Sequence, residues 1–369
     1  MLNALPRAMA LCASVAVAIL AGSASVGASP ATAERGQPAA PAARSLADPA
    51  FDSRTGVPSV MLPALERLVR PSQHPVTPGA RKFPHVKTLV YTAQYWGNDL
   101  KIYKVEASTP SFIESLTSGL RRPQGIATTV PSAGDREANH GVRGDWYVAN
   151  TGDSNIPIYE STPSGPQGPT SILDDRGEYP ADVAVSDTMD LVVASNMSTT
   201  RFGPGSLSLY ANGATSPTGQ LTVDGLVEGV GVAFDRAGDC FWSINQFSSA
   251  TASIVEFPHC SGTATTVVSD IGFAGGIAFD RDDNLYYADQ VSGVYKCVGT
   301  SQCTLLASGF SDPMFINFDA EWATLWLTDA GGYIDALDPE TGAIRTSTLA
   351  DGGFSDPPFG IALAPGARY

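Results

Sequence analysis

Six polar residues stand at the ends of short apolar and aromatic runs, where their side chains could bind a ligand or a metal ion. They are Gln94, Asn150, Asn196, Asn245, Asp289 and Asp329. A set of carboxylate and amide oxygens without histidine suits Ca²⁺ or Mg²⁺ better than zinc. Asp289, Asp329 and Asn245 are therefore the candidate metal ligands. The alternative is that all six residues cap strand ends by hydrogen bonding to neighbouring loops.

Four further carboxylates precede short strands and could take part in acid–base chemistry. They are Glu178, Glu228, Asp312 and Asp356, expected in loops beside Arg121, Arg122 and several aromatic residues. A pair such as Asp312 with Asp356 could act as acid and base if burial raised the pKa of one member. The same residues could instead form the rim of a ligand-binding site, or an ordinary surface loop.

Signature motifs of common enzyme classes are missing from the sequence. It contains no G-x-S-x-G elbow, no phosphate-binding loop, no dinucleotide-binding glycine motif and no H-E-x-x-H pair. The motifs therefore identify no reaction, and the catalytic residues are unknown at this stage.

The strands that must position these residues recur along the chain. Runs of the type Gly276-Ile277-Ala278 begin at Gly125, Asp182, Gly231, Gly276, Phe315 and Gly360, and each of the six polar residues above ends a second type of run. Four short strands per unit and six units predict an all-β, six-bladed β-propeller over residues 87–369. The last run, Gly360–Ala364, has no following strands, so we expect it to complete the first blade from inside (3+1 closure).

In such a ring, the ends of the second strands and the loops leading into the inner strands lie on one face, which we call the channel-mouth face. Both groups of polar residues should therefore gather there. The aspartates that follow inner strands, such as Asp235 and Asp280, have a structural explanation instead. A side chain of this type stabilises a tight turn by accepting backbone N–H groups.

The first 86 residues differ from the repeats in composition. Residues 1–33 have the form of a secretory signal peptide of bacterial type, with Arg7 before an apolar stretch and cleavage expected after Ala33, or after Ala28 as the second choice. Residues 34–86 read as an Ala/Pro-rich linker with a short helix from Pro63 to Arg70. No later stretch is apolar enough to span a membrane, so we expect a secreted protein, and we expect it to be a monomer.

The net charge indicates which partners suit the chain, and the cysteine content indicates whether it contains disulfides. The net charge of −15 disfavours binding to nucleic acid, whose phosphates would be repelled. Four cysteines follow the leader, and an even number in an exported chain indicates disulfides. Their spacing favours the pairs Cys240–Cys260 and Cys297–Cys303; a four-thiolate zinc site is the alternative, although no C-x₂-C pair is present.

The repeated phrase Gly276-Ile277-Ala278-Phe279-Asp280, a polar turn and Leu285-Tyr286-Tyr287-Ala288-Asp289 resembles the six-bladed propellers of the NHL-repeat and SMP-30/gluconolactonase-like superfamily. The resemblance covers residues 87–369. It implies lactonases, lyases or pure binding proteins, because this fold hosts all three. Enzymes of the SMP-30 type hold a divalent cation with Glu, Asn and Asp near the inner strands. Of the matching positions, namely Gln124, Ala181, Val230, Gly275, Met314 and Phe359, only Gln124 is polar, so that ligand set is not kept.

Two functions lead, and a third, a structural envelope protein, is favoured only by the predicted secretion and the linker. The first is a secreted propeller that binds a small molecule, a glycan or a protein through its channel-mouth face, with no cofactor. The second is a divalent-cation-dependent hydrolase resembling lactonases of the SMP-30/gluconolactonase type, with Ca²⁺ or Mg²⁺ held by Asp289 and Asp329. The binding hypothesis ranks first because it requires only the fold and explains the missing ligand set.

Overall fold

The structure is a computed structural model that describes residues 88–129, 145–160, 168–186, 189–201, 203–246 and 252–364, with the backbone pairing of β1 (Phe51–Asp52) and β2 (Val57–Pro58). The signal peptide predicted for residues 1–33 and the helix predicted at Pro63–Arg70 lie outside the described residues. The β1–β2 pair falls within the predicted linker, and the sequence analysis did not anticipate it.

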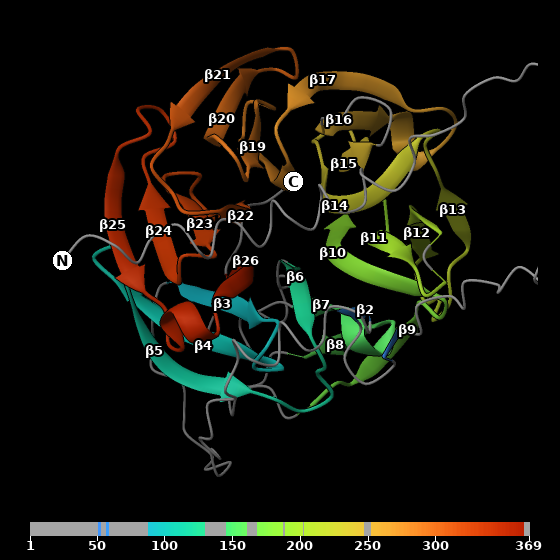
Figure 1. The fold of residues 1–369 in the computed structure, drawn as a ribbon, viewed down its shortest axis with the longest axis horizontal. Coiled ribbons are helices and arrows are strands. Elements are labelled where there is room, and N and C mark those ends of the chain that lie inside the picture. Colours follow the sequence, from blue (N-terminus) through green and yellow to red (C-terminus); the bar gives the residue numbers. More distant parts are fainter. Residues whose placement is uncertain are drawn as a thin grey trace, which may run out of the picture. The chain divides into compact units, whose positions relative to one another are not determined.

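Six four-stranded antiparallel sheets lie around a common centre (Figure 1), which confirms the predicted all-β, six-bladed propeller. Blade 1 contains β26 (Pro358–Ala364), β3 (Leu89–Gln94), β4 (Asp99–Glu106) and β5 (Thr109–Leu116); blade 2 contains β6 (Pro123–Thr128), β7 (Trp146–Asn150), β8 (Asn155–Tyr159) and β9 (Ser171–Asp174); blade 3 contains β10 (Glu178–Ser186), β11 (Leu191–Thr199), β12 (Pro204–Ala211) and β13 (Gly219–Leu221). Blade 4 contains β14 (Leu226–Phe234), β15 (Cys240–Gln246), β16 (Ala252–Phe257) and β17 (Thr265–Ile271); blade 5 contains β18 (Ala274–Phe279), β19 (Leu285–Asp289), β20 (Gly293–Val298) and β21 (Gln302–Ala307); blade 6 contains β22 (Pro313–Phe318), β23 (Leu325–Asp329), β24 (Tyr333–Leu337) and β25 (Ile344–Leu349).

The C-terminal strand closes the ring. β26 is the innermost strand of blade 1 and pairs antiparallel with β3, with Ile361 opposite Thr92 and Ala362 opposite Tyr91. It begins at Pro358, two residues before the predicted start. The 3+1 closure is thus confirmed, and it covers an edge of β3 that would otherwise be free to pair with another chain.

The recurring glycines of the inner strands allow neighbouring blades to approach each other. A Cβ atom on Gly276 would lie 2.8 Å from the Cα atom of Phe315 in the next blade, and one on Gly231 would lie 2.8 Å from the Cα atom of Gly276. At the closure, a Cβ atom on Gly360 would lie 2.9 Å from the Cα atom of Gly125. These distances are too short for a real side chain, so glycine at these positions sets the spacing of the ring.

Aromatic side chains of the second strands fill the space between blades. Their rings contact rings of the following blade in the pairs Tyr91–Trp146, Phe241–Phe279 and Tyr286–Phe318, with centroids 4.2, 4.7 and 5.0 Å apart. All six rings are almost completely buried. Tilted and edge-to-face contacts of this kind stabilise a core beyond the burial of apolar area.

Both predicted disulfides are present in the structure. Cys297 and Cys303 face each other on β20 and β21, and Cys240 at the start of β15 bonds to Cys260 at the end of the short 3₁₀ helix η2 (Pro258–Cys260). Two disulfides suit an extracellular or otherwise oxidising environment. Within the described residues, none of the helices has the length and apolar character needed to cross a membrane.

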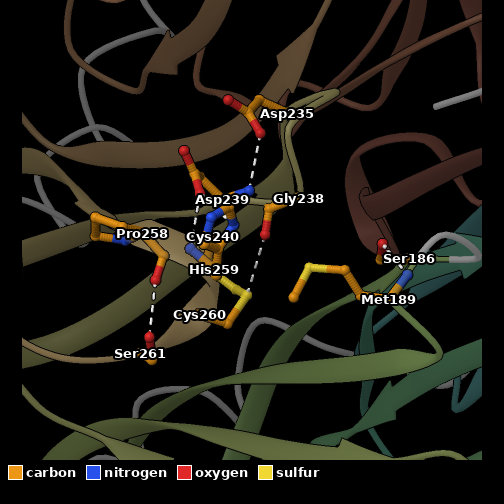
Figure 2. Close-up of a disulfide and its surroundings, with 10 residues drawn as sticks. All are labelled: Ser186, Met189, Asp235, Gly238, Asp239, Cys240, Pro258, His259, Cys260 and Ser261. Atoms are coloured by element: carbon orange, nitrogen blue, oxygen red, sulfur yellow. Dashed lines mark hydrogen bonds and ion pairs between the residues drawn. A yellow bond between two sulfur atoms is a disulfide. The ribbon is translucent and has the colours of Figure 1, made fainter.

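The aspartates that follow inner strands stabilise turns, as predicted. Figure 2 shows Asp235 beside the Cys240–Cys260 bridge, where its Oδ1 atom accepts the backbone N–H of Asp239 at 2.8 Å. In blade 5, Oδ1 of Asp280 accepts the backbone N–H of Asn284 at 2.9 Å. These carboxylates belong to the scaffold.

Candidate functional site

The two aspartates at the strand ends bind the loops around them. The carboxylate of Asp289 accepts the backbone N–H groups of Gly272, Phe273 and Val291, each at 3.0 Å. The carboxylate of Asp329 accepts the backbone N–H groups of Ser311, Asp312 and Gly331 at 2.8, 2.9 and 2.8 Å. Each side chain therefore ties the loop that enters the inner strand to the turn that leaves the second strand.

Two of the four amide side chains in this set, those of Asn150 and Asn245, accept backbone N–H groups in the same way. Oδ1 of Asn150 accepts the backbone N–H of Arg121 at 2.6 Å, and Oδ1 of Asn245 accepts the backbone N–H of Ala274 at 3.1 Å. Asn196 does not end its strand as predicted, because β11 continues to Thr199. Its Nδ2 group donates to the hydroxyls of Ser206 and Ser208 on the neighbouring strand β12, at 3.1 and 2.9 Å. Gln94, with its amide oriented to satisfy both terminal atoms, donates to the carbonyl oxygen of Asp356 at 2.7 Å.

The three residues assigned to a cation, Asp289, Asp329 and Asn245, come from three different blades. The hydrogen bonds above direct their oxygens at backbone amides. Across the described residues, no group of three or more His, Cys, Asp or Glu is arranged to hold a metal ion. These contacts agree with the capping alternative, and the cation assignment stays a prediction.

Of the four further carboxylates, two lie on strands rather than in loops. Glu178 is the first residue of β10 and Glu228 the third of β14, so their predicted loop placement was wrong. The two inner strands extend further toward the channel-mouth face than expected, through irregular pairing with β11 and β15. Asp312 and Asp356 lie in loops as predicted.

These carboxyls are more difficult to ionise than in water. Burial raises the pKa of Glu178 to about 7, and burial together with the nearby Asp329 raises the pKa of Asp312 to about 7. Burial also raises the pKa of Glu228. Among the described residues, Oε2 of Glu178 and Oδ1 of Asp312 have no hydrogen-bond partner. Each can exchange a proton near neutral pH, although the charged neighbour of Asp312 is Asp329 and not Asp356.

Asp356 belongs to a group of charged residues that we call the closure cluster: Asp99 and Lys101 on β4, with Asp351 and Asp356 in the loop before β26. The Nζ atom of Lys101, on a side chain only 3% exposed, lies 3.1 Å from Oδ2 of Asp351 and 3.8 Å from Oδ2 of Asp356. Burial and then the charge of Asp99 raise the pKa of Asp356 to about 6. The cluster joins β4 to the loop before β26, on both sides of the ring closure.

Gly97 makes room for this cluster. Its backbone N–H donates to Oδ1 of Asp356 at 2.9 Å. A Cβ atom at this position would lie 2.3 Å from Oδ2 of Asp356 and 2.7 Å from Oδ1 of Asp99. Within the described residues, those two oxygens have no hydrogen-bond partner. Sequence reasoning found Asp356 but not Asp99, Lys101 or Asp351.

A cavity of about 540 Å³ opens on the channel-mouth face between blades 1 and 2. Three loops form it: the one between β3 and β4, the one between β5 and β6, and the 3₁₀ helix η1 (Thr151–Asp153) after β7. Its lining consists of Trp96, Asn98, Gly119, Leu120, Arg121, Arg122 and Asp153. We call it the arginine pocket. The sequence analysis named Arg121 and Arg122 but not Trp96, Asn98 or Asp153, because it did not consider the loops that follow the second strands.

Aromatic rings position Arg122 in this pocket. Its guanidinium carbon lies 5.2 Å from the ring centroid of Tyr95 and 5.6 Å from that of Trp96. The ring of Phe359, at the closing strand, packs on Tyr95 with centroids 5.4 Å apart. A cation over aromatic faces is favourable, and more so where water is excluded. The channel-mouth face at blades 1 and 2 thus combines aromatic and cationic groups, whereas Glu178, Glu228 and Asp312 lie on blades 3, 4 and 6.

Comparisons with known proteins support the fold. No protein-family model matches the chain, and no curated protein matches it either. A chain from the crystal structure of a nidogen/laminin complex superposes with a TM-score of 0.57 at 13% identity, covering 75% of this chain and 98% of that one. A luciferin-regenerating enzyme and a calcium-binding protein, regucalcin, from Agrobacterium tumefaciens each give a TM-score of 0.45 at 15% identity. They cover 62% and 63% of this chain, and 76% and 75% of their own. Such likenesses concern the fold alone.

Proposed function

We propose that this chain is an exported β-propeller that binds a ligand or partner through its channel-mouth face. In this proposal, residues 1–33 direct export, residues 34–86 form a linker, and residues 87–369 carry the binding face. The observation that carries the proposal is the arginine pocket, where Trp96, Arg121 and Arg122 line a cavity of about 540 Å³. That volume lies in the range of small-molecule sites, and arginine and tryptophan are enriched among the residues that contribute most of the binding energy at interfaces.

The surrounding loops support this role because they are anchored. Asn150, Asn245, Asp289 and Asp329 fix neighbouring segments by accepting backbone N–H groups, so little order has to be gained when a ligand binds. A site that is formed in advance loses less conformational entropy on binding, which raises affinity. The ring of capping residues predicted as a binding site would then contribute indirectly, by holding the loops that touch the ligand.

A thermal-shift screen tests the proposal. The wild type, Trp96→Ala and a control, Phe112→Ala, would be melted with a library of organic acids, sugars and short peptides. Phe112 is a 43% exposed aromatic residue on the outer strand β5, outside the arginine pocket. We expect at least one chemical class to raise the Tm of the wild type and of Phe112→Ala but not of Trp96→Ala. Equal shifts in all three proteins would count against the channel-mouth face.

One observation favours the second candidate, a divalent-cation-dependent hydrolase. One buried carboxylate oxygen of Glu178 and one of Asp312 have no hydrogen-bond partner among the described residues. Such an oxygen can bind a cation or a proton. Metal analysis of the purified chain tests this candidate, with Asp289→Asn/Asp329→Asn as the comparison. Stoichiometric Ca²⁺ or Mg²⁺ that is lost in the double variant would favour the hydrolase. A Tm that does not respond to chelator or to added metal would exclude it.

A further inference from the structure

The arginine pocket has a charge opposite to that of the chain around it. The sequence contains 22 Lys and Arg against 37 Asp and Glu, yet the pocket lining holds two arginines and one acid. Closely spaced arginines favour an anionic ligand group, because the guanidinium fork matches the geometry of a carboxylate or phosphate.

The backbone of the pocket is fixed in an unusual geometry. Asn98 and Arg122 both have left-handed backbone conformations, with φ of 58° and 55°. The two residues are joined, because Oδ1 of Asn98 accepts the backbone N–H of Arg122 at 2.9 Å. Asn150 holds the neighbouring amide of Arg121 in the same way at 2.6 Å. Asparagine tolerates this conformation but arginine does not favour it, and strained positions of this kind gather at binding sites.

The pocket already holds a carboxylate on one of its arginines. Oδ1 of Asp153 lies 3.3 Å from Nη1 of Arg121, which also donates to the carbonyl oxygen of Gly152 at 3.0 Å. The side chains of Arg121 and Asp153 are 28% and 42% exposed. An ion pair this exposed contributes little to stability, so another carboxylate can replace Asp153 with little loss. Asp153 thereby marks the position at which the anionic group of a ligand would bind.

The other wall of the pocket is apolar. Trp96 and Leu120 line it, and the stacking of Arg122 against Trp96 holds the indole in place. A ligand that fits both walls has a charged end and a flat apolar body. On the basis of the function proposed above, we infer that the arginine pocket binds a small organic carboxylate, whose charged group replaces Asp153 at Arg121 and whose apolar body lies against Trp96.

Calorimetric titration of the full chain with three probes tests this inference. Sodium benzoate has both the charge and the ring, benzyl alcohol has the ring without the charge, and inorganic phosphate has the charge without the ring. We expect benzoate to bind roughly tenfold more tightly than either of the others, since a charge-assisted contact and an apolar contact are both needed. Equal affinity for benzoate and benzyl alcohol, equal affinity for benzoate and phosphate, or no binding of benzoate would each overturn the inference.

Asp153→Asn provides the sharper test because the substitution should strengthen binding. It removes the internal competitor and leaves an exposed side chain of the same shape, so we expect the affinity for benzoate to rise several-fold. The matched control is Asp174→Asn, since Asp174 forms a similar exposed pair with Arg176 outside the pocket. Weaker binding in Asp153→Asn, or the same gain in the control, would overturn the inference. If the thermal-shift screen instead finds neutral ligands that depend on Trp96, the proposed function stands and only the carboxylate class is wrong.

Discussion

The Nζ atom of Lys101 lies 3.8 Å from Oδ2 of Asp356, and this contact joins the first blade to the loop that leads into the closing strand. Lys101 also donates to the carbonyl oxygen of Asp351 at 2.5 Å. A buried ammonium group among three aspartates is favourable only while all partners stay in place. The ring closure is thus maintained by ionic contacts as well as by strand pairing.

Replacement of Lys101 tests this role. Lys101→Met removes the cation and leaves buried acids uncompensated, so we expect the free energy of unfolding to fall by about 3 kcal/mol in urea denaturation at pH 8. Lys104→Met is the control, because Lys104 forms an exposed pair with Glu106 on the same strand and should change stability by less than about 0.5 kcal/mol. Equal effects of the two substitutions would contradict the role of the closure cluster.

Stability should fall as the pH rises from 5 to 8. Burial raises the pKa of Asp182 to about 8, and Glu178 and Asp312 titrate near 7. An acid whose pKa is raised in the folded state takes up a proton on folding. Its contribution is therefore fully present below the pKa of the unfolded chain, near 4, and is lost as the pH rises through the folded value. The Tm measured across this range should decline.

Asp182→Asn isolates one part of this dependence. Asp182 is buried between inner strands, where its Oδ2 atom accepts the backbone N–H of Val232 at 3.0 Å. Between pH 5 and 8, the free energy of unfolding should fall less steeply in the variant than in the wild type, by up to about 1.4 kcal/mol per pH unit. Asp338→Asn is the control: its partner Arg345 lowers the pKa of Asp338, so removal should lower stability evenly over this range. An unchanged slope in Asp182→Asn would be evidence against the raised pKa.

The inner-strand glycines should not tolerate even one methyl group. In Gly276→Ala the new Cβ atom would meet the backbone of Phe315 at 2.8 Å, which forces blades 5 and 6 apart, and we expect a loss of about 2 kcal/mol or more. Gly219→Ala is the matched control on the outer strand β13, where the nearest atom is the flexible side chain of Leu209 at 3.4 Å. The two free energies of unfolding, measured in urea, should differ clearly.

Deletion of residues Gly360–Tyr369 removes most of β26 and exposes the edge of β3. An uncovered strand edge pairs with other chains, so we expect a lower Tm and oligomers in size-exclusion chromatography with light scattering. The full-length chain is the reference. A truncated chain that stays monomeric with an unchanged Tm would show that the closure contributes nothing.

The fold could be predicted because its determinants repeat. A small residue on the inner strand lets a blade approach its neighbour, and an aromatic residue on the second strand fills the gap between blades. Four of the six inner strands have a glycine at this position and five of the six second strands have a buried aromatic residue, whereas blade 3 has neither. Gly276 and Tyr286 meet these needs in blade 5, and their counterparts recur around the ring. Five of the six polar positions lie at or next to a strand end as predicted, whereas Asn196 lies inside β11. The residue type alone does not distinguish an Asp289 that caps a strand from one that binds a ligand.

Other features could not be predicted because they depend on single irregularities or on distant contacts. The sequence predicts Glu178 in a loop, whereas in the structure irregular pairing lengthens β10 to include it. No repeat in the sequence encodes that irregularity. Lys101 and Asp351 are 250 residues apart in sequence, so nothing local relates them. Trp96 and Asp153 line one cavity from two neighbouring blades, and their proximity follows from the packing of these blades and not from any motif.

The closure of blade 1 by β26 also affects how the chain matures. Strands β3, β4 and β5 are made before the other five blades, but their inner partner β26 follows those five blades in the chain. A nascent chain must therefore keep the edge of β3 exposed until blades 2 to 6 and β26 have been made. Long-range pairings of this kind slow folding and leave such edges open to aggregation. The strand that closes the ring thus also determines when the newly made protein stops being prone to self-association.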